Sequence, residues 1–183
     1  LFTIVLEISV MMAQFPSKEI AKLSYEFRTL GLGYANIGGL LMQQGYSYDS
    51  KEGRAMCAAI TALMTGESYN ISSLIAKELG PFNKFKENNK EMLKVIYNHK
   101  MAAYGEEKYY KSLSTLPVPL KKNDCPDKEL VESAKESWKN ALNNGNKFGF
   151  RNAQTTVIAP TGTIGLVMDC DTTGIEPDFS TVK

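Results

Sequence analysis

This chain has few of the residues that build metal centres or disulfide frameworks. Its 183 residues include one histidine, His99, and three scattered cysteines, Cys57, Cys125 and Cys170. No two cysteines form a CxxC pair, which argues against a zinc site with cysteine and histidine ligands. Unpaired cysteines are typical of a reducing compartment. We therefore expect a cytoplasmic protein with no metal site in this stretch.

Excess charge and long apolar runs are absent as well. The formal net charge of +1 argues against non-specific binding to nucleic acid. The apolar run from Leu1 to Ala13 contains Glu7, has no basic leader and is shorter than a membrane span of roughly twenty residues. It predicts a buried helix inside a large protein, not a signal peptide or a membrane anchor.

The common nucleotide-binding fingerprints are also missing. A P-loop needs a lysine after its last glycine, and none follows Gly165. In the run from Gly31 to Asn36, Asn36 stands where a dinucleotide fingerprint has its third glycine. The chain is thus neither a Walker NTPase nor a clear Rossmann domain.

The sequence does contain a turn suited to an anion, Ala159-Pro160-Thr161-Gly162-Thr163-Ile164-Gly165. The β-branched run before it predicts a strand, and the residues after the proline predict a tight turn and a helix start. Free N–H groups at a helix N-terminus favour a phosphate, and Gly162 lets a ligand approach the backbone. Thr161 and Thr163 add hydroxyl donors. A turn of this kind more often only joins a strand to the next element.

Most of the remaining sequence predicts helices within one domain. Thr29 to Tyr34 is the exception, because its spaced glycines favour a short strand where backbones approach closely. Helices are predicted to start at Pro16-Ser17, at Asn36 as cap, at Ser50 and at Asp127, with another from Glu91 to Met101. Their predicted ends include Leu79 before Gly80-Pro81, and Asn144-Gly145.

Two blocks of sequence resemble the catalytic subunits of ribonucleotide reductases, and most closely the adenosylcobalamin-dependent class. The first block runs from Arg151 to Phe179 and reads RNAQTTVIAPTGTIG, then MDCDTTGIEPDF. The second runs from Arg28 to Met42 and reads RTLGLGYANIGGLLM. The resemblance implies an α/β fold, with residues 1–183 forming a mostly helical part of the C-terminal half of a ten-stranded α/β barrel and no second domain.

The resemblance also implies a function. In this family, the loop matching Pro160, Thr161, Gly162, Thr163 and Ile164 holds the diphosphate of the substrate. The parent enzyme reduces ribonucleoside diphosphates to 2'-deoxyribonucleotides through a thiyl radical. It needs adenosylcobalamin, a dithiol reductant such as thioredoxin and the remainder of the reductase chain, and it can form a homodimer. Neither nucleic acid nor a membrane is expected as a partner.

The radical-site loop of the family, Asn-x-Cys-x-Glu, does not occur in this sequence. We therefore assign no catalytic residue and expect an internal piece of a larger enzyme that is inactive alone. One alternative is a non-catalytic phosphate-binding or split-subunit module whose partner carries the radical cysteine. Another is a purely structural helical fragment.

Several other residues receive structural interpretations. His99 is predicted to be a solvated helix residue, and Trp138 a core residue. Cys170 is predicted to be a small packed residue, because the carboxylates beside it argue against a nucleophilic thiolate. Asp169, Asp171 and Glu176 could suggest a cation site, but the family has no metal there.

Overall fold

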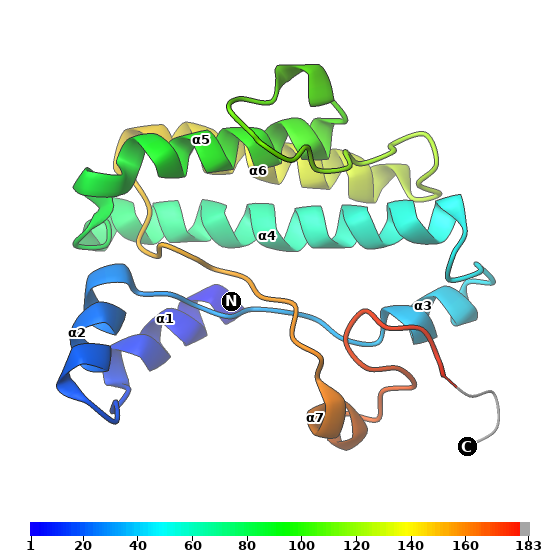
Figure 1. Ribbon diagram of the computed structural model, residues 1–183, viewed down its shortest axis with the longest axis horizontal. Coiled ribbons are helices and arrows are strands. Elements are labelled where there is room, and N and C mark those ends of the chain that lie inside the picture. Colours follow the sequence, from blue (N-terminus) through cyan, green and yellow to red (C-terminus); the bar gives the residue numbers. More distant parts are fainter. Residues whose placement is uncertain (180–183) are drawn as a thin grey trace.

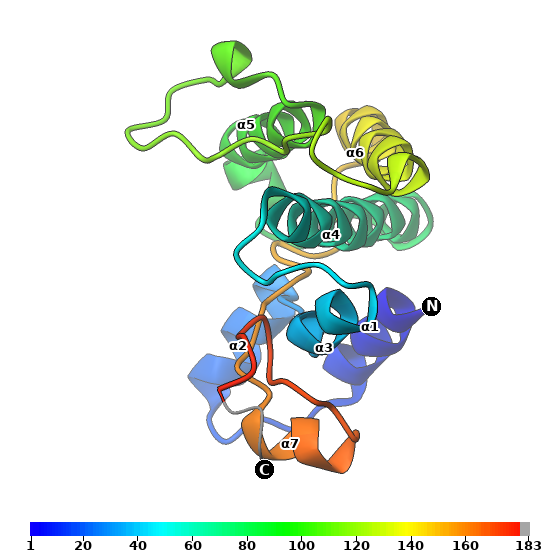
Figure 2. The same cartoon turned by 90° about the vertical axis from the view of Figure 1, so that its right-hand side faces the viewer.

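Seven α-helices and one 3-10 turn form the regular structure of the computed structural model, which describes residues 1–179. They are α1 (Phe2–Met12), α2 (Lys18–Phe27), α3 (Ile37–Gln43), α4 (Lys51–Leu79), α5 (Phe85–Tyr104), the 3-10 turn (Glu107–Tyr109), α6 (Lys128–Phe148) and α7 (Gly162–Val167). Helices α4, α5 and α6 pack together as one helical layer, in which α5 and α6 lie side by side on the same side of α4 (Figure 1 and Figure 2). The other four helices lie beyond α4, and two extended segments cross between (Figure 2).

The two extended segments, residues 28–34 and 152–158, lie side by side, and we call them the parallel pair. The Leu30 N–H donates to the Gln154 carbonyl at 2.8 Å, and the Val157 N–H donates to the Leu32 carbonyl at 2.9 Å. A Cβ atom on Gly33 would stand 2.3 Å from the Val157 carbonyl oxygen. The close backbone approach predicted from the glycine spacing is therefore confirmed.

The mostly helical character is confirmed, but the ten-stranded barrel is not seen in this stretch. Among residues 1–179, ladder pairing is limited to one isolated parallel bridge between Leu32 and Thr156. A barrel closes only when every strand is paired on both sides. One parallel pair leaves both outer edges open, so these residues alone cannot form the barrel.

Helix α4 is confirmed from end to end. The Ser50 hydroxyl accepts the Gly53 N–H at 2.9 Å, which caps the start. Gly80, at φ 81°, and Pro81 end the helix after Leu79. Its buried residues are mostly small, which lets α6 approach on one side and α1 and Asn152 on the other. At Gly66, a Cβ atom would stand 2.9 Å from Trp138 Cδ1.

An aromatic core joins the three helices of this layer. Trp138 of α6 is 1% exposed, which confirms it as a core residue, and Phe150 is fully buried. The Tyr69 ring meets the Phe150 ring edge-on, with centroids 5.6 Å apart. Burying one such side chain contributes about 1.5–3 kcal/mol, so this cluster fixes how the helices stack.

Three predicted helix boundaries were wrong. Helix α5 begins at Phe85 and not at Glu91, because the Phe85 ring packs edge-on against Phe82, and it ends at Tyr104 and not at Met101. Helix α6 continues through Asn144-Gly145 to Phe148. Gly145 stays helical because the Phe150 ring fills the space beside it: a Cβ atom there would stand 2.1 Å from Phe150 Cζ. Gly149, at φ 74°, ends the helix instead.

Helix α1 forms as predicted but is not buried within this chain. Its two buried side chains are the polar Thr3 and Glu7. The Thr3 hydroxyl lies 3.1 Å from the Ser68 hydroxyl of α4. The apolar side chains point outward, and Phe2 is 68% exposed. The helix is therefore inverted relative to an ordinary surface helix.

Candidate functional site: the turn before α7

The predicted turn and helix start are present at the end of the second extended segment. The predicted strand is not, because within residues 1–179 this segment pairs only through one isolated bridge at Thr156. Thr161 has left-handed backbone angles, φ 50° and ψ 41°, and α7 begins at the next residue. The Gly165 N–H donates to the Thr161 carbonyl at 3.0 Å, which closes the first helical turn. The chain therefore turns at Thr161, and the first residues of α7 are exposed.

Three consecutive N–H groups are left free by this geometry. Within residues 1–179, the amides of Gly162, Thr163 and Ile164 have no hydrogen-bond acceptor, and all three residues are exposed. In the described part of the chain, nothing lies within 4 Å of the position that a Cβ atom would take on Gly162. Adjacent free amides at a helix start offer partial positive charge to an anion. The five residues from Pro160 to Ile164 are thus brought together as a single exposed turn.

The two threonines of the turn are used differently. The Thr161 hydroxyl donates to the Pro160 carbonyl at 2.7 Å and accepts the Gly174 N–H at 2.7 Å. The Thr163 hydroxyl has no partner in the described part of the chain. The expectation that both hydroxyls are available donors therefore holds in this structure for Thr163 only.

The chain after α7 returns to α3 and contacts its N-terminus. Asn36 occupies the cap position of α3 as predicted, but its side chain makes no cap hydrogen bond. Asn36 has a left-handed backbone, and its Oδ1 instead accepts the Thr172 N–H at 2.9 Å. The Thr172 hydroxyl accepts the Gly39 N–H at 3.3 Å, so Thr172 performs the capping expected of Asn36. The two distinctive sequence blocks therefore meet here.

At the opposite end, the parallel pair is anchored by a buried ionic cluster around Glu7. Glu7 Oε1 accepts hydrogen bonds from Arg28 Nε and Arg151 Nε, each at 2.8 Å. Glu7 Oε2 accepts one from Asn152 Nδ2 at 2.6 Å. The Asn152 side chain is fully buried and also accepts the Ser72 hydroxyl at 2.8 Å. This cluster was not predicted, although Glu7, a lone acidic residue in an apolar run, was its signal in the sequence.

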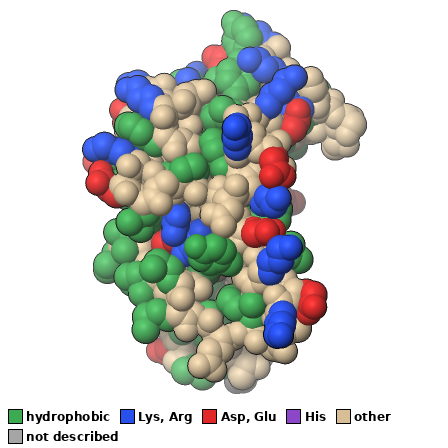
Figure 3. All heavy atoms as spheres, turned by 90° about the vertical axis from the view of Figure 1, so that its left-hand side faces the viewer, with side chains coloured by type: hydrophobic (Ala, Val, Ile, Leu, Met, Phe, Trp, Pro, Cys, Tyr) green, Lys and Arg blue, Asp and Glu red, His purple; other side chains and the backbone are tan. Residues whose placement is uncertain are grey.

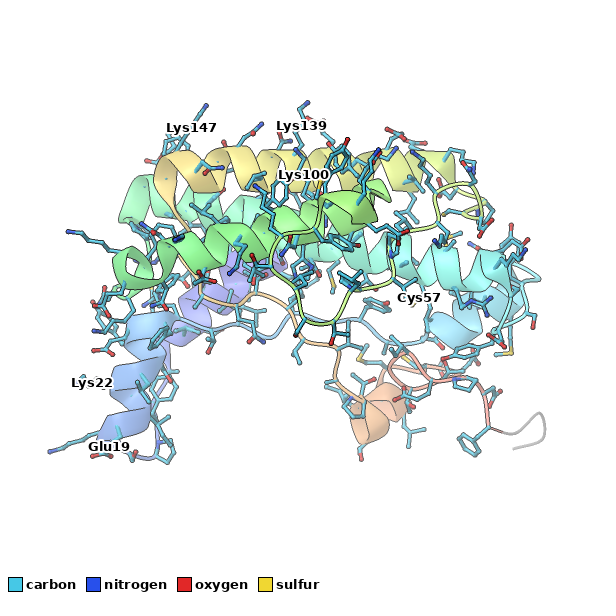
Figure 4. All side chains as sticks on the ribbon, turned by 45° about the horizontal axis from the view of Figure 1, so that its top comes forward. Glu19, Lys22, Cys57, Lys100, Lys139 and Lys147 are labelled. Carbon is cyan, nitrogen blue, oxygen red and sulfur yellow. The ribbon has the colours of Figure 1, made fainter. Side chains whose placement is uncertain are left out.

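A smaller polar group lies where the parallel pair meets α4. The Tyr34 hydroxyl lies 2.6 Å from the Thr61 hydroxyl and 3.3 Å from Cys57 Sγ. Cys57 lies on the side of α4 that faces the extended segments, whereas Lys139 and Lys147 of α6 point outward (Figure 4). Burial, and then the hydrogen bond with Cys57, raise the pKa of Tyr34 well above its usual value. The Tyr34 side chain therefore stays neutral, and its hydroxyl serves as a hydrogen-bonding partner of Thr61 and Cys57.

His99 is exposed, as predicted, but one face of its ring is covered. It stacks on Trp138, with centroids 5.1 Å apart and planes 6° apart. Desolvation by this contact lowers the pKa of His99 below its usual value. His99 also lines a largely apolar cavity of about 450 Å³ between α4, α5 and residues 156–158.

Cys170 is half-buried beside α7, in keeping with the packed role predicted for it.

Together, these features are those of an α/β protein. A layer of helices covers a pair of parallel extended segments, and a turn with free amides follows one of them. Parallel pairing under helices is typical of α/β proteins, whose ligand sites lie beyond the carboxyl ends of their strands.

The family is established by sequence comparison. The ribonucleotide reductase barrel domain matches residues 1–183, so the chain belongs to that family. The vitamin B12-dependent ribonucleotide reductase of Bradyrhizobium diazoefficiens is 67% identical over 183 residues, and that of Agrobacterium fabrum is 64% identical. This chain is covered fully in both cases but spans only 15% and 14% of the length of those proteins.

A more distant relative has a different name. The ribonucleoside-diphosphate reductase subunit alpha of Chlamydia pneumoniae is 27% identical over 169 residues, which cover 90% of this chain and 14% of that protein. Separately, none of the helices in the described residues is both long and apolar enough to cross a membrane.

Proposed function

We propose that this chain is part of the catalytic barrel of a ribonucleotide reductase, in its C-terminal half, and that the turn from Pro160 to Ile164 holds the substrate diphosphate. The parent enzyme would convert ribonucleoside diphosphates to 2'-deoxyribonucleotides by a thiyl-radical mechanism. Membership of the family and the names of the two most similar relatives given above support this assignment.

One observation carries the proposal for the turn. The amides of Gly162, Thr163 and Ile164 are consecutive, exposed and without acceptors in residues 1–179. A diphosphate supplies several anionic oxygens, which match a row of N–H donors at a helix start. The open space at Gly162 allows a phosphate to reach the backbone itself, and the free Thr163 hydroxyl adds one donor.

The radical chemistry would come from the rest of the parent chain. None of Cys57, Cys125 and Cys170 stands in an Asn-x-Cys-x-Glu loop, so we expect no turnover from these 183 residues alone. The role of this segment is to bind and orient the substrate, which lowers the entropic part of the barrier. A dithiol protein such as thioredoxin would return the electrons.

We propose adenosylcobalamin as the cofactor of the parent, following the names of the relatives. When bound, it would supply the radical. The residues described here do not fit it: the single imidazole lies flat on Trp138, and the cavity that it lines measures about 450 Å³. That volume suits a small molecule and is far below what a corrin with its nucleotide arm fills.

The experiment is to change Gly162 to valine in the full-length parent enzyme and measure substrate binding. A Cβ atom at this position would have nothing within 4 Å of it in residues 1–179, so we expect the fold to be unaffected while a bound phosphate is displaced. We expect the Kd for a ribonucleoside diphosphate to rise at least about tenfold, which corresponds to ~1.4 kcal/mol.

Two controls isolate the phosphate. The unphosphorylated ribonucleoside should bind the variant and the original enzyme equally. Val167→Ala, an exposed change on the same helix, should leave the diphosphate Kd unchanged. An unchanged diphosphate Kd in the Gly162→Val variant would show that the turn is not part of the substrate site. A ribonucleoside triphosphate, assayed in parallel, would show which phosphate chain the turn prefers.

A further inference from the structure

The segment after α7, residues 170–176, contacts the turn and α3 at the same time, and we call it the brace. On the turn side, the Gly174 N–H donates to the Thr161 hydroxyl at 2.7 Å, and the Cys170 N–H donates to the Gly165 carbonyl at 3.0 Å. On the α3 side, Thr172 contacts Asn36 and Gly39. The brace therefore links the turn to a helix more than a hundred residues earlier in the sequence.

Thr172 is the buried anchor of this link. It is 4% exposed, and its hydroxyl lies 3.3 Å from both Asn36 Oδ1 and the Gly39 N–H. A Cβ atom on Gly38 would stand 2.8 Å from Thr172 Cγ2. The glycine pair at the start of α3 therefore leaves the space that this side chain occupies.

Thr161 is held in a conformation that its side chain disfavours. A β-branched residue at φ 50° is an outlier, because its Cβ crowds the backbone. The hydroxyl offsets this by bonding both the Pro160 carbonyl and the Gly174 N–H. Its single proton is committed to Pro160, so it has none to donate to a phosphate.

We propose that the brace sets the geometry of the diphosphate turn, with Thr172 and the Thr161 hydroxyl as positioning residues and Thr163 as the threonine whose hydroxyl reaches the phosphate. The inference rests on the proposed function of the turn. Thr161 and Thr163 then have different roles: the Thr161 hydroxyl faces inward to the brace, and the Thr163 hydroxyl faces the ligand.

The test compares Thr172→Val with Thr172→Ser in the full-length parent enzyme. Valine keeps the shape of the side chain but removes the hydroxyl, whereas serine keeps the hydroxyl. We expect Thr172→Val to raise KM for the ribonucleoside diphosphate about five- to tenfold, as expected for one or two lost hydrogen bonds. We expect kcat to change less than KM, and serine to restore KM.

A merely structural role for Thr172 would give another pattern. It would lower the melting temperature and the fraction of active enzyme while KM stayed unchanged in the molecules that fold. That result would contradict the role proposed for the brace. The unphosphorylated ribonucleoside serves as internal reference, because the brace predicts no change in its binding.

A double substitution tests Thr161 separately. If Thr161 acts through the brace, Thr161→Val and Thr172→Val disturb the same link, so their effects on KM should combine to less than their product. Independent, multiplicative effects would mark Thr161 as a direct ligand and contradict the inference. Thr161→Ser keeps the hydroxyl and should preserve KM. This variant allows the test even if Thr161→Val does not fold.

The two proposals fail in distinguishable ways. If Gly162→Val and Thr163→Val raise KM but Thr172→Val does not, the brace is wrong and the diphosphate turn stands. If Gly162→Val, Thr163→Val and Thr172→Val all leave KM and inhibition by inorganic pyrophosphate unchanged, the turn is not the phosphate site and both proposals fall.

Discussion

At the scale of single residues, Glu7 holds together parts of the chain that are far apart in sequence. Its carboxylate bonds Arg28, Arg151 and Asn152, which stand at the starts of the two extended segments. Glu7 and Arg28 are almost fully buried, so each charge depends on the other for compensation. The cluster thereby fixes the relative positions of the two segments that lead to α3 and to the turn.

Replacing Glu7 with glutamine should destabilise the parent enzyme markedly. Two guanidinium groups would then remain at a site with no counter-charge, a change that costs about 3–5 kcal/mol. Thermal unfolding of the full-length enzyme measures this as a lowered melting temperature. Glu136→Gln is the matched control, because Glu136 forms an exposed ion pair with Lys139 that contributes little. Equal melting temperatures for both variants would contradict the role assigned to Glu7.

His99 should make stability depend on pH. Its pKa is lowered in the folded state, so the unfolded state binds the proton more readily. Stability contributed by the neutral ring is therefore complete above the unfolded pKa, near 6.5, and is lost as pH falls through the lower folded value. The effect should be small because only one face of the ring is covered.

The measurement is the change in melting temperature between pH 7.5 and pH 5.5, taken for the original protein and for His99→Gln. The glutamine variant should lose less stability on acidification than the original protein. An identical or larger loss in the variant would show that stacking on Trp138 does not resist protonation.

At the scale of elements, the sequence predicted what local chemistry decides. The start of α4 at Ser50 and its end before Gly80-Pro81 follow from a side-chain cap and from backbone restrictions. The turn before α7 follows in the same way. The end of α6 does not follow from local chemistry. Phe150 lies beyond the end of the helix and packs against Gly145 only after the chain turns back at Gly149. The inversion of α1 likewise depends on Ser68, Arg28 and Asn152, which no local pattern reveals.

Gly145→Ala in α6 should destabilise the protein although alanine is the better helix former. The usual gain of about 1 kcal/mol is outweighed because the new methyl group would overlap the buried Phe150 ring, and overpacking costs about 1–3 kcal/mol. Unfolding midpoints of the full-length enzyme measure the difference. Asn143→Ala, on the exposed face of the same helix, should be neutral or slightly stabilising. A stabilised Gly145→Ala variant would mean that the ring moves freely.

At the scale of the whole molecule, the two sides differ in character. Helix α6 carries exposed ion pairs such as Lys135 with Glu132 and Lys139 with Glu136. Helices α1 and α7 instead expose apolar side chains, among them Phe2, Ile8 and Val167. At the end of the molecule where α2 lies, hydrophobic side chains are exposed over one side while charges of both signs alternate over the other (Figure 3). An apolar surface of this kind is typical of an interface.

A charge on this apolar side should act oppositely in the short chain and in the parent. Ile8 is 49% exposed here, so Ile8→Lys should reduce self-association of the 183-residue chain, measured by light scattering. In the full-length enzyme the same change should lower the melting temperature, because the lysine would be buried against the remaining polypeptide. No loss of stability in the parent would show that α1 faces solvent there.

The parallel pair also affects the order in which parts of the molecule fold. The contacts Glu7 with Asn152 and Gly39 with Thr172 join residues 145 and 133 positions apart, whereas α4, α5 and α6 lie between them in sequence. Contacts of such separation carry a large loop-closure cost and form slowly unless intervening chain folds first. We expect the helical layer to condense early and bring residues 28–34 and 152–158 within reach of each other. The turn before α7 would then be the last part to acquire its shape, so the diphosphate site proposed above would be complete only once synthesis has passed Gly174.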